Sequence, residues 1–206
     1  MSEHLIDAPR RQRARRGDGD LLKEEIVAAA TRLLVEKGDQ EAVSIRAIAD
    51  AVGVTPPSIY LHFADKDELF LEVCRDRFME LDRRMVALGE TANDPIDGLH
   101  RRGEAYIRFG LENPEEYRIL FIDHPKSTSP EQVKDWAAFQ HMVEAVQRCI
   151  DSGDIAPGDP MVITIGLWAA VHGITSLMIS MPEFPWPTPD VIIDHVLSMC
   201  VYGLRP

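Results

Sequence analysis

One stretch of the chain concentrates side chains that can bind nucleic acid. Residues 44–63 read SIRAIADAVGVTPPSIYLHF, a short helix, a glycine turn and a second short helix. The outward-facing residues are hydroxyls, an imidazole and cations, with no carboxylate among them: Ser44, Arg46, Thr55, Ser58, Tyr60, His62 and Lys66. In a helix-turn-helix the second helix enters the major groove of DNA, and hydroxyl and cationic groups contact phosphates. These residue types therefore indicate DNA binding.

The turn between the two helices is made of residues typical of such turns. Gly53 supplies backbone freedom, Thr55 is expected to cap the second helix, and Pro56 takes the first helical position. Val54 and Ile59 have the spacing of a hydrophobic staple. The expected small core, shared with a helix over residues 21–37, consists of Ile45, Ile48, Ala49, Val52, Ile59 and Phe63.

The longer run SIRAIADAVGVTPPSIYLHFADKDELF resembles the N-terminal DNA-binding region of the TetR family of transcriptional regulators. The resemblance covers about residues 20–80. Its matching features are a first helix that ends at Lys37-Gly38, followed by Ile48-Ala49, Val52-Gly53-Val54, Tyr60, His62-Phe63, Lys66 and Leu69.

The resemblance implies phosphate contacts for Tyr60, His62 and Lys66. It places Ser44, Thr55 and Ser58 on phosphates or base edges. Pro56 and Pro57 depart from the pattern, since many members carry a basic or flexible residue there. We include both prolines in the interface and expect base readout to use Ser58, Arg46 and apolar contact with a thymine methyl group.

Several of these residues have a plainer interpretation. Tyr60 could be a core aromatic residue, and His62 and Lys66 could be merely solvated. Five arginines lie between Arg10 and Arg16. They form either a disordered solubilising tail or an arm that reaches phosphates or the minor groove.

Charge is distributed unevenly along the 206 residues, whose net charge is −12. Residues 1–66 hold 10 basic and 11 acidic side chains, and residues 67–206 hold 12 and 23. The acidic excess argues against binding of the whole protein to anionic surfaces. We expect a basic disordered arm at 1–19, a helix-turn-helix domain at 20–66 and an effector-binding and dimerisation domain at 67–206.

The fold class predicted is all-α, with about nine helices. No stretch shows sustained strand-like alternation, and six pairs of a capping residue followed by proline mark helix starts at residues 55, 94, 113, 129, 159 and 188. The cap oxygen is expected to accept a hydrogen bond from the first turn. Beyond residue 63 the expected helices cover about residues 66–87, 95–112, 114–123, 130–152, 160–181 and 189–203.

The resemblance implies that the helices within residues 66–152 enclose a small-molecule pocket. It also implies that the helices at 160–181 and 189–203 pair with a partner subunit as a four-helix bundle. Residues 160–182 contain no charged side chain, and a monomer would expose much of this apolar surface. Such a segment could also span a membrane. Its acidic flanks without Lys or Arg, and its Thr, Ser and His residues, argue against that.

Residues Trp168, His172 and Gly173 resemble the Trp-x-x-x-His-Gly motif of one class of C-terminal domains in this family. They are either a core pair, with Gly173 allowing close helix contact, or ligand contacts. The other pocket candidates, each with the alternative of ordinary core, are Tyr106, Phe109, Phe121, Phe139 and Met142. No charged anchor is obvious, so we expect a small, largely apolar effector.

No enzyme signature is visible in the chain. It has no HExxH, no Gly-rich phosphate loop and no nucleophile elbow, so we expect no catalytic residue, metal or cofactor. The N-terminus has no apolar signal region, and three scattered cysteines fit a reducing cytoplasm.

We therefore predict a cytoplasmic transcriptional regulator, by family habit a repressor, that binds a palindromic double-stranded DNA operator as a homodimer and is released by its effector. The alternative is an effector-independent DNA-binding dimer without a functional pocket.

Overall fold

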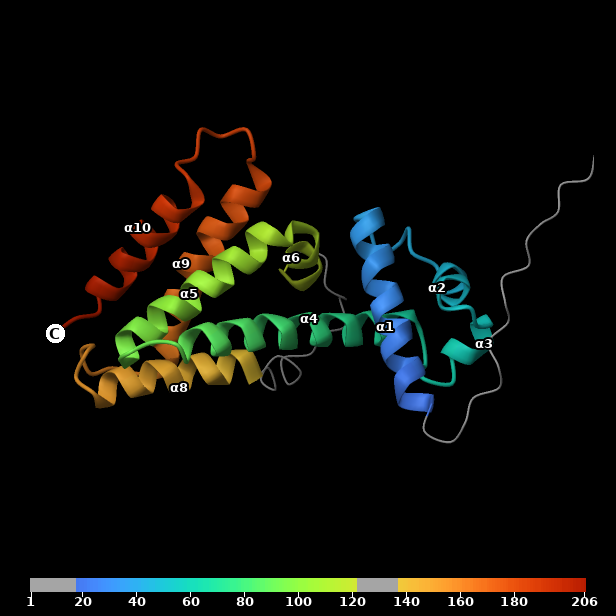
Figure 1. Cartoon of the computed structure of the whole chain (residues 1–206), viewed down its shortest axis with the longest axis horizontal. Coiled ribbons are helices and arrows are strands. Elements are labelled where there is room, and N and C mark those ends of the chain that lie inside the picture. The colour runs from blue at the N-terminus through green and yellow to red at the C-terminus, as the bar shows by residue number, and fades with distance from the viewer. Residues whose placement is uncertain (1–17, 122–136) are drawn as a thin grey trace, which may run out of the picture. The chain divides into compact units, whose positions relative to one another are not determined.

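The computed structural model describes residues 18–121 and 137–206, and every regular element in these ranges is a helix (Figure 1). This confirms the predicted all-α class. The arginine run from Arg10 to Arg16 and the helix start at Ser129-Pro130 lie outside the described residues.

The described residues divide into two compact units. The first contains residues 18–75 and 118–121, and the second contains 76–117 and 137–206. The division falls inside α4, which runs from Lys66 to Gly89 and therefore contributes to both units. The domain boundary that we expected, after residue 66, lies at the start of this helix.

The first unit is built from three helices and the start of α4. These are α1 (Asp18–Lys37), α2 (Ile45–Val52) and α3 (Pro56–Ile59). α2 packs against both α1 and α3. Their shared core is apolar, and its members that are at most 2% exposed include Ile26, Ala30, Ile48, Ala49, Ile59, Phe63, Leu69 and Phe70.

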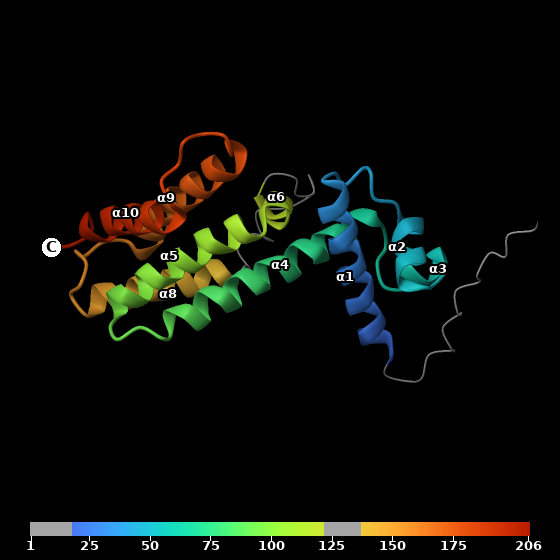
Figure 2. The ribbon, with the colours of Figure 1, turned by 45° about the horizontal axis from the view of Figure 1, so that its top comes forward.

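The second unit is organised around α5 (Pro95–Glu112). α5 packs against α8 (Ala137–Asp151), α9 (Pro160–Ser180) and α10 (Pro189–Tyr202), as Figures 1 and 2 show. α9 also packs against α8 and α10. The remaining helix, α6 (Pro114–Phe121), follows α5 directly.

Five helices begin at the prolines that the sequence indicated: α3, α5, α6, α9 and α10. Only part of the expected capping is present. Asp94 accepts a hydrogen bond from the Asp97 N–H at 2.8 Å, and Asp159 accepts one from the Met161 N–H at 2.9 Å. Thr55 and Thr188 make no side-chain cap bond.

Asn113 also departs from the expected capping. Its side-chain amide donates to the Phe109 carbonyl at 3.0 Å. It therefore satisfies the end of α5, because the last carbonyls of a helix lack partners within the helix.

The buried side of α9 is unexpectedly polar. Its fully buried residues are Thr164, Val171 and Thr175, and each threonine hydroxyl donates to the carbonyl four residues earlier at 2.7 Å. Gly110 of α5 leaves the space that the Thr175 methyl occupies. Several large apolar side chains of α9 are instead exposed, namely Met161, Val162, Ile165, Trp168 and Leu177. By length and composition α9 is long and apolar enough to cross a membrane.

Candidate functional site

The first part of the candidate DNA surface is the turn after α2. Ser44 caps α2 by accepting a hydrogen bond from the Ala47 N–H at 3.1 Å. Gly53 ends the helix in the left-handed region, with φ 78°, and its N–H donates to the Ala49 carbonyl at 2.9 Å. A side chain at that φ would be strained. The glycine therefore fixes the direction in which the chain enters α3.

The two hydroxyls at the start of α3 bond to each other. Thr55 Oγ1 and Ser58 Oγ are 3.1 Å apart, and the Ser58 N–H donates to the Thr55 carbonyl at 2.8 Å. This arrangement replaces the expected cap by Thr55. One hydroxyl donates to the other, so the pair retains a donor and free lone pairs with which to bind a phosphate or a base edge.

None of the nine residues that the sequence indicated for this surface is buried. Five are exposed, namely Ser44, Arg46, Thr55, Pro57 and Tyr60, and four are half-buried, namely Pro56, Ser58, His62 and Lys66. The Tyr60 side chain is 53% exposed, so it is not a core aromatic residue, whereas Phe63 is 2% exposed.

Two further residues belong to this surface, and the sequence analysis missed both. Leu61 lies between Tyr60 and His62 and is 83% exposed. The signal was present, because Ile59 and Phe63 occupy inward positions and leave Leu61 on the outside. Asp50 of α2, four residues after Arg46, is also exposed, as are Asp65 and Asp67 beside Lys66, so the surface is not free of carboxylates.

The cations of this surface have no ion-pair partner among the described residues. Arg46 is exposed, and Lys66 Nζ lies 5.3 Å from the centre of the Phe70 ring. The nearby carboxylates Asp65 and Glu68 accept hydrogen bonds from backbone N–H groups at 2.8 and 2.5 Å. Both cations are therefore available to phosphates.

Four of the seven predicted pocket residues come together in the second unit. The Trp168 indole N–H donates to the Tyr106 hydroxyl at 3.2 Å, and that hydroxyl lies 3.1 Å from His172 Nδ1. The Phe139 and Trp168 rings meet edge to face, with centroids 6.3 Å apart. Aromatic residues from α5, α8 and α9 are thereby linked.

Tyr117 completes this cluster, and the sequence analysis did not select it. Its hydroxyl is 2.6 Å from His172 Nδ1, and its ring is fully buried. If the hydroxyl donates, His172 is neutral and carries its proton on Nε2, 3.4 Å from Ser176 Oγ. Burial lowers the pKa of His172, which favours this neutral form. Burial also raises the pKa of Tyr117, so its hydroxyl stays protonated.

The other three pocket candidates lie elsewhere. Met142 is partly buried against a separate apolar cluster that contains Leu99, Val146 and Cys149. Phe109 is buried under the guanidinium of Arg84, which is 5.4 Å from the ring centre. Phe121 is half-buried at the end of α6. Within the described chain, nothing lies within 4 Å of a Cβ at Gly173. No other helix of the described chain therefore makes a close contact at Gly173.

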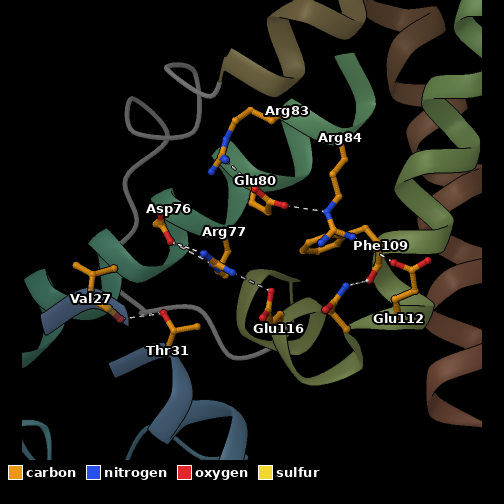
Figure 3. A network of polar contacts seen from close by, with 11 residues as sticks. Val27, Thr31, Asp76, Arg77, Glu80, Arg83, Arg84, Phe109, Glu112 and Glu116 are labelled. Atoms are coloured by element: carbon orange, nitrogen blue, oxygen red, sulfur yellow. Dashed lines mark hydrogen bonds and ion pairs between the residues drawn. The ribbon is translucent and has the colours of Figure 1, made fainter. Parts of the chain in front are cut away.

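Ion pairs join α4 to the elements that follow it in the second unit (Figure 3). Arg77 lies between Asp76 and Glu116, with its Nη1 3.2 Å from Glu116. Arg84 pairs with Glu80 at 2.9 Å and with Glu112 at 3.2 Å. These pairs are partly exposed, so each contributes little to stability. Two of them, to Glu116 and Glu112, connect α4 to α6 and to α5.

The chemistry of the cysteines does not suggest a nucleophile. Cys74 and Cys149 are buried, and burial raises their thiol pKa values to about 12 and about 11. Both remain neutral thiols at neutral pH.

Comparison with known families and proteins agrees with this architecture. Residues 26–73 match the family described as bacterial regulatory proteins, tetR family, and residues 99–199 match a tetracyclin repressor-like C-terminal domain. The chain is 30% identical over 147 residues to the transcriptional repressor KstR2 of Mycolicibacterium smegmatis, which covers 66% of this chain and 68% of the relative. It is 26% identical over 162 residues to the transcriptional activator FasR of the same species, covering 77% and 72%.

A solved structure of a protein of unknown function from Rhodococcus sp. RHA1 has the same fold. Its TM-score is 0.80 at 23% identity, and the match covers 95% of this chain and 100% of that one. Both curated relatives are regulators of transcription and not enzymes. The two family matches, over residues 26–73 and 99–199, and a helix-turn-helix surface with accessible cations lead to one conclusion. The chain belongs to the TetR family of DNA-binding transcriptional regulators.

Proposed function

We propose that this protein binds a palindromic operator in the cytoplasm as a homodimer, represses transcription there and leaves the DNA when a small, largely apolar effector binds. The observation that carries the proposal is the surface of α2 and α3, where all nine predicted contact residues remain accessible. The relatives leave both repression and activation open, since one is named a repressor and another an activator. We propose repression, which is the common habit of the family.

In this proposal the contacts divide into two kinds. Tyr60, His62 and Lys66 bind phosphates and set the position of the protein on the duplex. Ser58, Arg46 and the exposed Leu61 face the bases, where an apolar side chain can contact a thymine methyl group. Ser44 and Thr55 add hydroxyl contacts, and Pro56 and Pro57 shape the tip of α3.

The exposed faces of α9 and α10 support the homodimer. Large apolar side chains on them are between 45% and 64% exposed, and these are Met161, Val162, Ile165, Leu177, Val191 and Met199. An exposed apolar surface of this kind marks an interface. Gly166 and Gly173 on the same helix leave open space for a close approach. A two-fold dimer presents two reading surfaces to a palindrome.

The effector would bind among α4, α5, α6 and α8, close to Tyr106, Phe139 and Trp168. Release requires that the effector bind two states of the dimer unequally. We propose α4 as the moving element, because it begins at Lys66 on the DNA-binding side and continues to Gly89 in the second unit.

The proposal is tested by fluorescence anisotropy on duplex DNA from upstream of the protein's own gene. A scrambled duplex and a second salt concentration are the controls. Tight binding to the upstream duplex alone supports the regulator. Equal binding to both duplexes that disappears with salt would be only counterion-driven association, and it would contradict the proposal.

An effector-independent dimer is distinguished by a thermal-shift screen with apolar compounds. A compound that raises the melting temperature and also lowers anisotropy on the operator supports the effector. If none of the compounds does either, the effector-independent dimer is the better description.

A further inference from the structure

A buried arginine in the second unit has an unused hydrogen-bond donor. Arg102 of α5 is 6% exposed, and its Nη1 has no partner in the part of the chain that the structure describes. Burial lowers the pKa of Arg102, and the neighbouring Arg148 lowers it further. A buried charge without a hydrogen-bonded partner is costly. Its presence therefore calls for an explanation.

Arg102 lines a cavity of about 590 Å³, which is within the range of small-molecule sites. Its walls come from the end of α4, the turn at residues 89–95, the start of α5 and one face of α8. Arg148 and His141 of α8 also line it, and none of the seven pocket candidates from the sequence does. The cavity is thus distinct from the cluster around Tyr106 and His172.

Gly89, the last residue of α4, makes room for the guanidinium. A Cβ there would lie 2.8 Å from Nε and 2.9 Å from Cγ of Arg102. The side chain would have to move. Gly98 of α5 also lies close to the end of α4. A Cβ at Gly98 would be 3.3 Å from the Gly89 carbonyl oxygen. Gly89 thus leaves the space that the Arg102 side chain occupies, and Gly98 lets the start of α5 approach the end of α4.

The acidic groups around the cavity do not satisfy Arg102. Asp82 is bonded to His141 Nδ1, with both carboxylate oxygens at 2.9 Å. Asp94 caps α5. Glu90 and Glu144 are exposed, and Asp82 and Glu90 act on Arg102 only through the electrostatic field. The buried Arg102 and the exposed Arg148 therefore line one cavity, and among the described residues no carboxylate is hydrogen-bonded to Arg102 Nη1.

We propose that this cavity binds a small molecule through an oxyanion, a carboxylate or a phosphate group, held by Arg102 and Arg148. The anion accepts a hydrogen bond from the unused N–H of Arg102 Nη1. Its negative charge also offsets the repulsion between the two guanidinium groups. Charge-assisted bonds of this type are strong, and guanidinium geometry suits both anions. Neither arginine was among the residues that the sequence indicated, and the ligand of this cavity is distinct from the apolar effector proposed above. The site does not depend on the proposed DNA binding.

The test is a thermal-shift titration of the full-length protein with inorganic phosphate and, separately, with butyrate. Ionic strength is held constant with sodium chloride. We expect a saturable rise of a few degrees in the wild type with at least one probe. The probe that acts distinguishes a phosphate from a carboxylate. No saturable rise with either probe would overturn the proposal.

Variants show whether the response comes from this cavity. Arg102→Met and Arg148→Gln should each weaken the midpoint of the titration at least about tenfold, since each loses a charge-assisted bond. Arg83→Gln is the control, because it removes the same charge from an arginine of α4 that does not line the cavity and whose side chain is 67% exposed. If all four proteins respond equally, the effect is a general effect of salts on stability, and the proposal fails.

The melting temperature without added anion gives an independent readout. Arg102→Met should melt at or above the wild-type temperature, because an unpaired buried charge is replaced by an apolar side chain. Gly89→Ala, with Arg102 retained but displaced, should weaken the response to the anion. Unchanged midpoints in both Gly89→Ala and Arg148→Gln would contradict the proposal even if Arg102→Met did not fold.

Discussion

The two units of the molecule place their polar chemistry in opposite positions. In the first unit the core around Ile48 and Ile59 is apolar apart from the buried Thr31, and most hydroxyls and cations lie on the surface of α2 and α3. In the second unit polar groups are buried, and they include Tyr117, Arg102 and Thr175. Its helices α9 and α10 expose apolar side chains instead.

This contrast follows from what each unit must contact. A surface that binds DNA needs accessible donors on a rigid support, so its core can be purely apolar. A unit that encloses a small molecule needs a few buried polar groups to orient the ligand. A face that meets a second subunit needs exposed apolar area. The distribution of polar groups is thus consistent with the three roles that we propose for the chain.

The largest expected effect comes from placing a charge on the exposed apolar face. Leu177 of α9 is 47% exposed, and Leu177→Arg should turn the dimer into a monomer, since burying an unpaired charge costs about 3–5 kcal/mol. Operator affinity should fall with it. Analytical ultracentrifugation measures the change. Met79→Arg on α4, where the native side chain is 55% exposed, is the control and should remain a dimer.

Removal of a buried tyrosine hydroxyl in the second unit should lower the stability of the protein. Removal of an exposed one in the first unit should leave stability unchanged. Tyr117→Phe removes the group that lies 2.6 Å from His172 Nδ1 and should lower the free energy of unfolding in urea by about 1–3 kcal/mol. Tyr60→Phe makes the same deletion at a side chain that is 53% exposed and should leave stability unchanged. Equal effects of the two variants would remove the contrast between the units.

Truncation of the exposed tyrosine should affect DNA binding alone. Tyr60→Ala should weaken operator affinity about tenfold, the loss of about 1.4 kcal/mol, because one phosphate contact disappears. The melting temperature should not change. Anisotropy titrations measure the affinity, and Met79→Ala serves as an equally exposed control. Unchanged affinity would take Tyr60 out of the interface.

The smallest expected effect is a dependence of stability on pH. Burial lowers the pKa of His172 in the folded chain, so the unfolded chain takes up its proton at higher pH. The free energy of unfolding should therefore fall as pH drops below the ordinary histidine pKa of about 6.5. His172→Gln should reduce this slope in urea titrations between about pH 7 and pH 5. Identical slopes in the two proteins would show that His172 is not desolvated.

Much of the fold was predictable, because its signals are local in the sequence. A proline at the first helical position predicted five helix starts, and apolar spacing predicted that Ile48, Ala49 and Phe63 form the core. The exposed surface of α2 and α3 followed from the same spacing, since residues that do not face the core must face solvent.

The features that the sequence did not reveal depend on contacts between distant residues. Gly89 and Arg102 meet across a turn, and Tyr117 meets His172 from another helix. Neither pair has a local signature. The cavity beside Arg102 arises from the packing of three helices. Because the sequence does not show this packing, nothing in it distinguishes the buried Arg102 from the other arginines.

The most direct test of the account is amide hydrogen exchange of the protein with and without operator DNA, followed by mass spectrometry. We predict that peptides covering residues 44–66 exchange more slowly when the operator is bound. Peptides from α9 and α10 should keep their rates, because the proposed dimer covers this face both with and without DNA. Protection that appears over residues 160–202 instead, with none over residues 44–66, would contradict the assignment of these two regions.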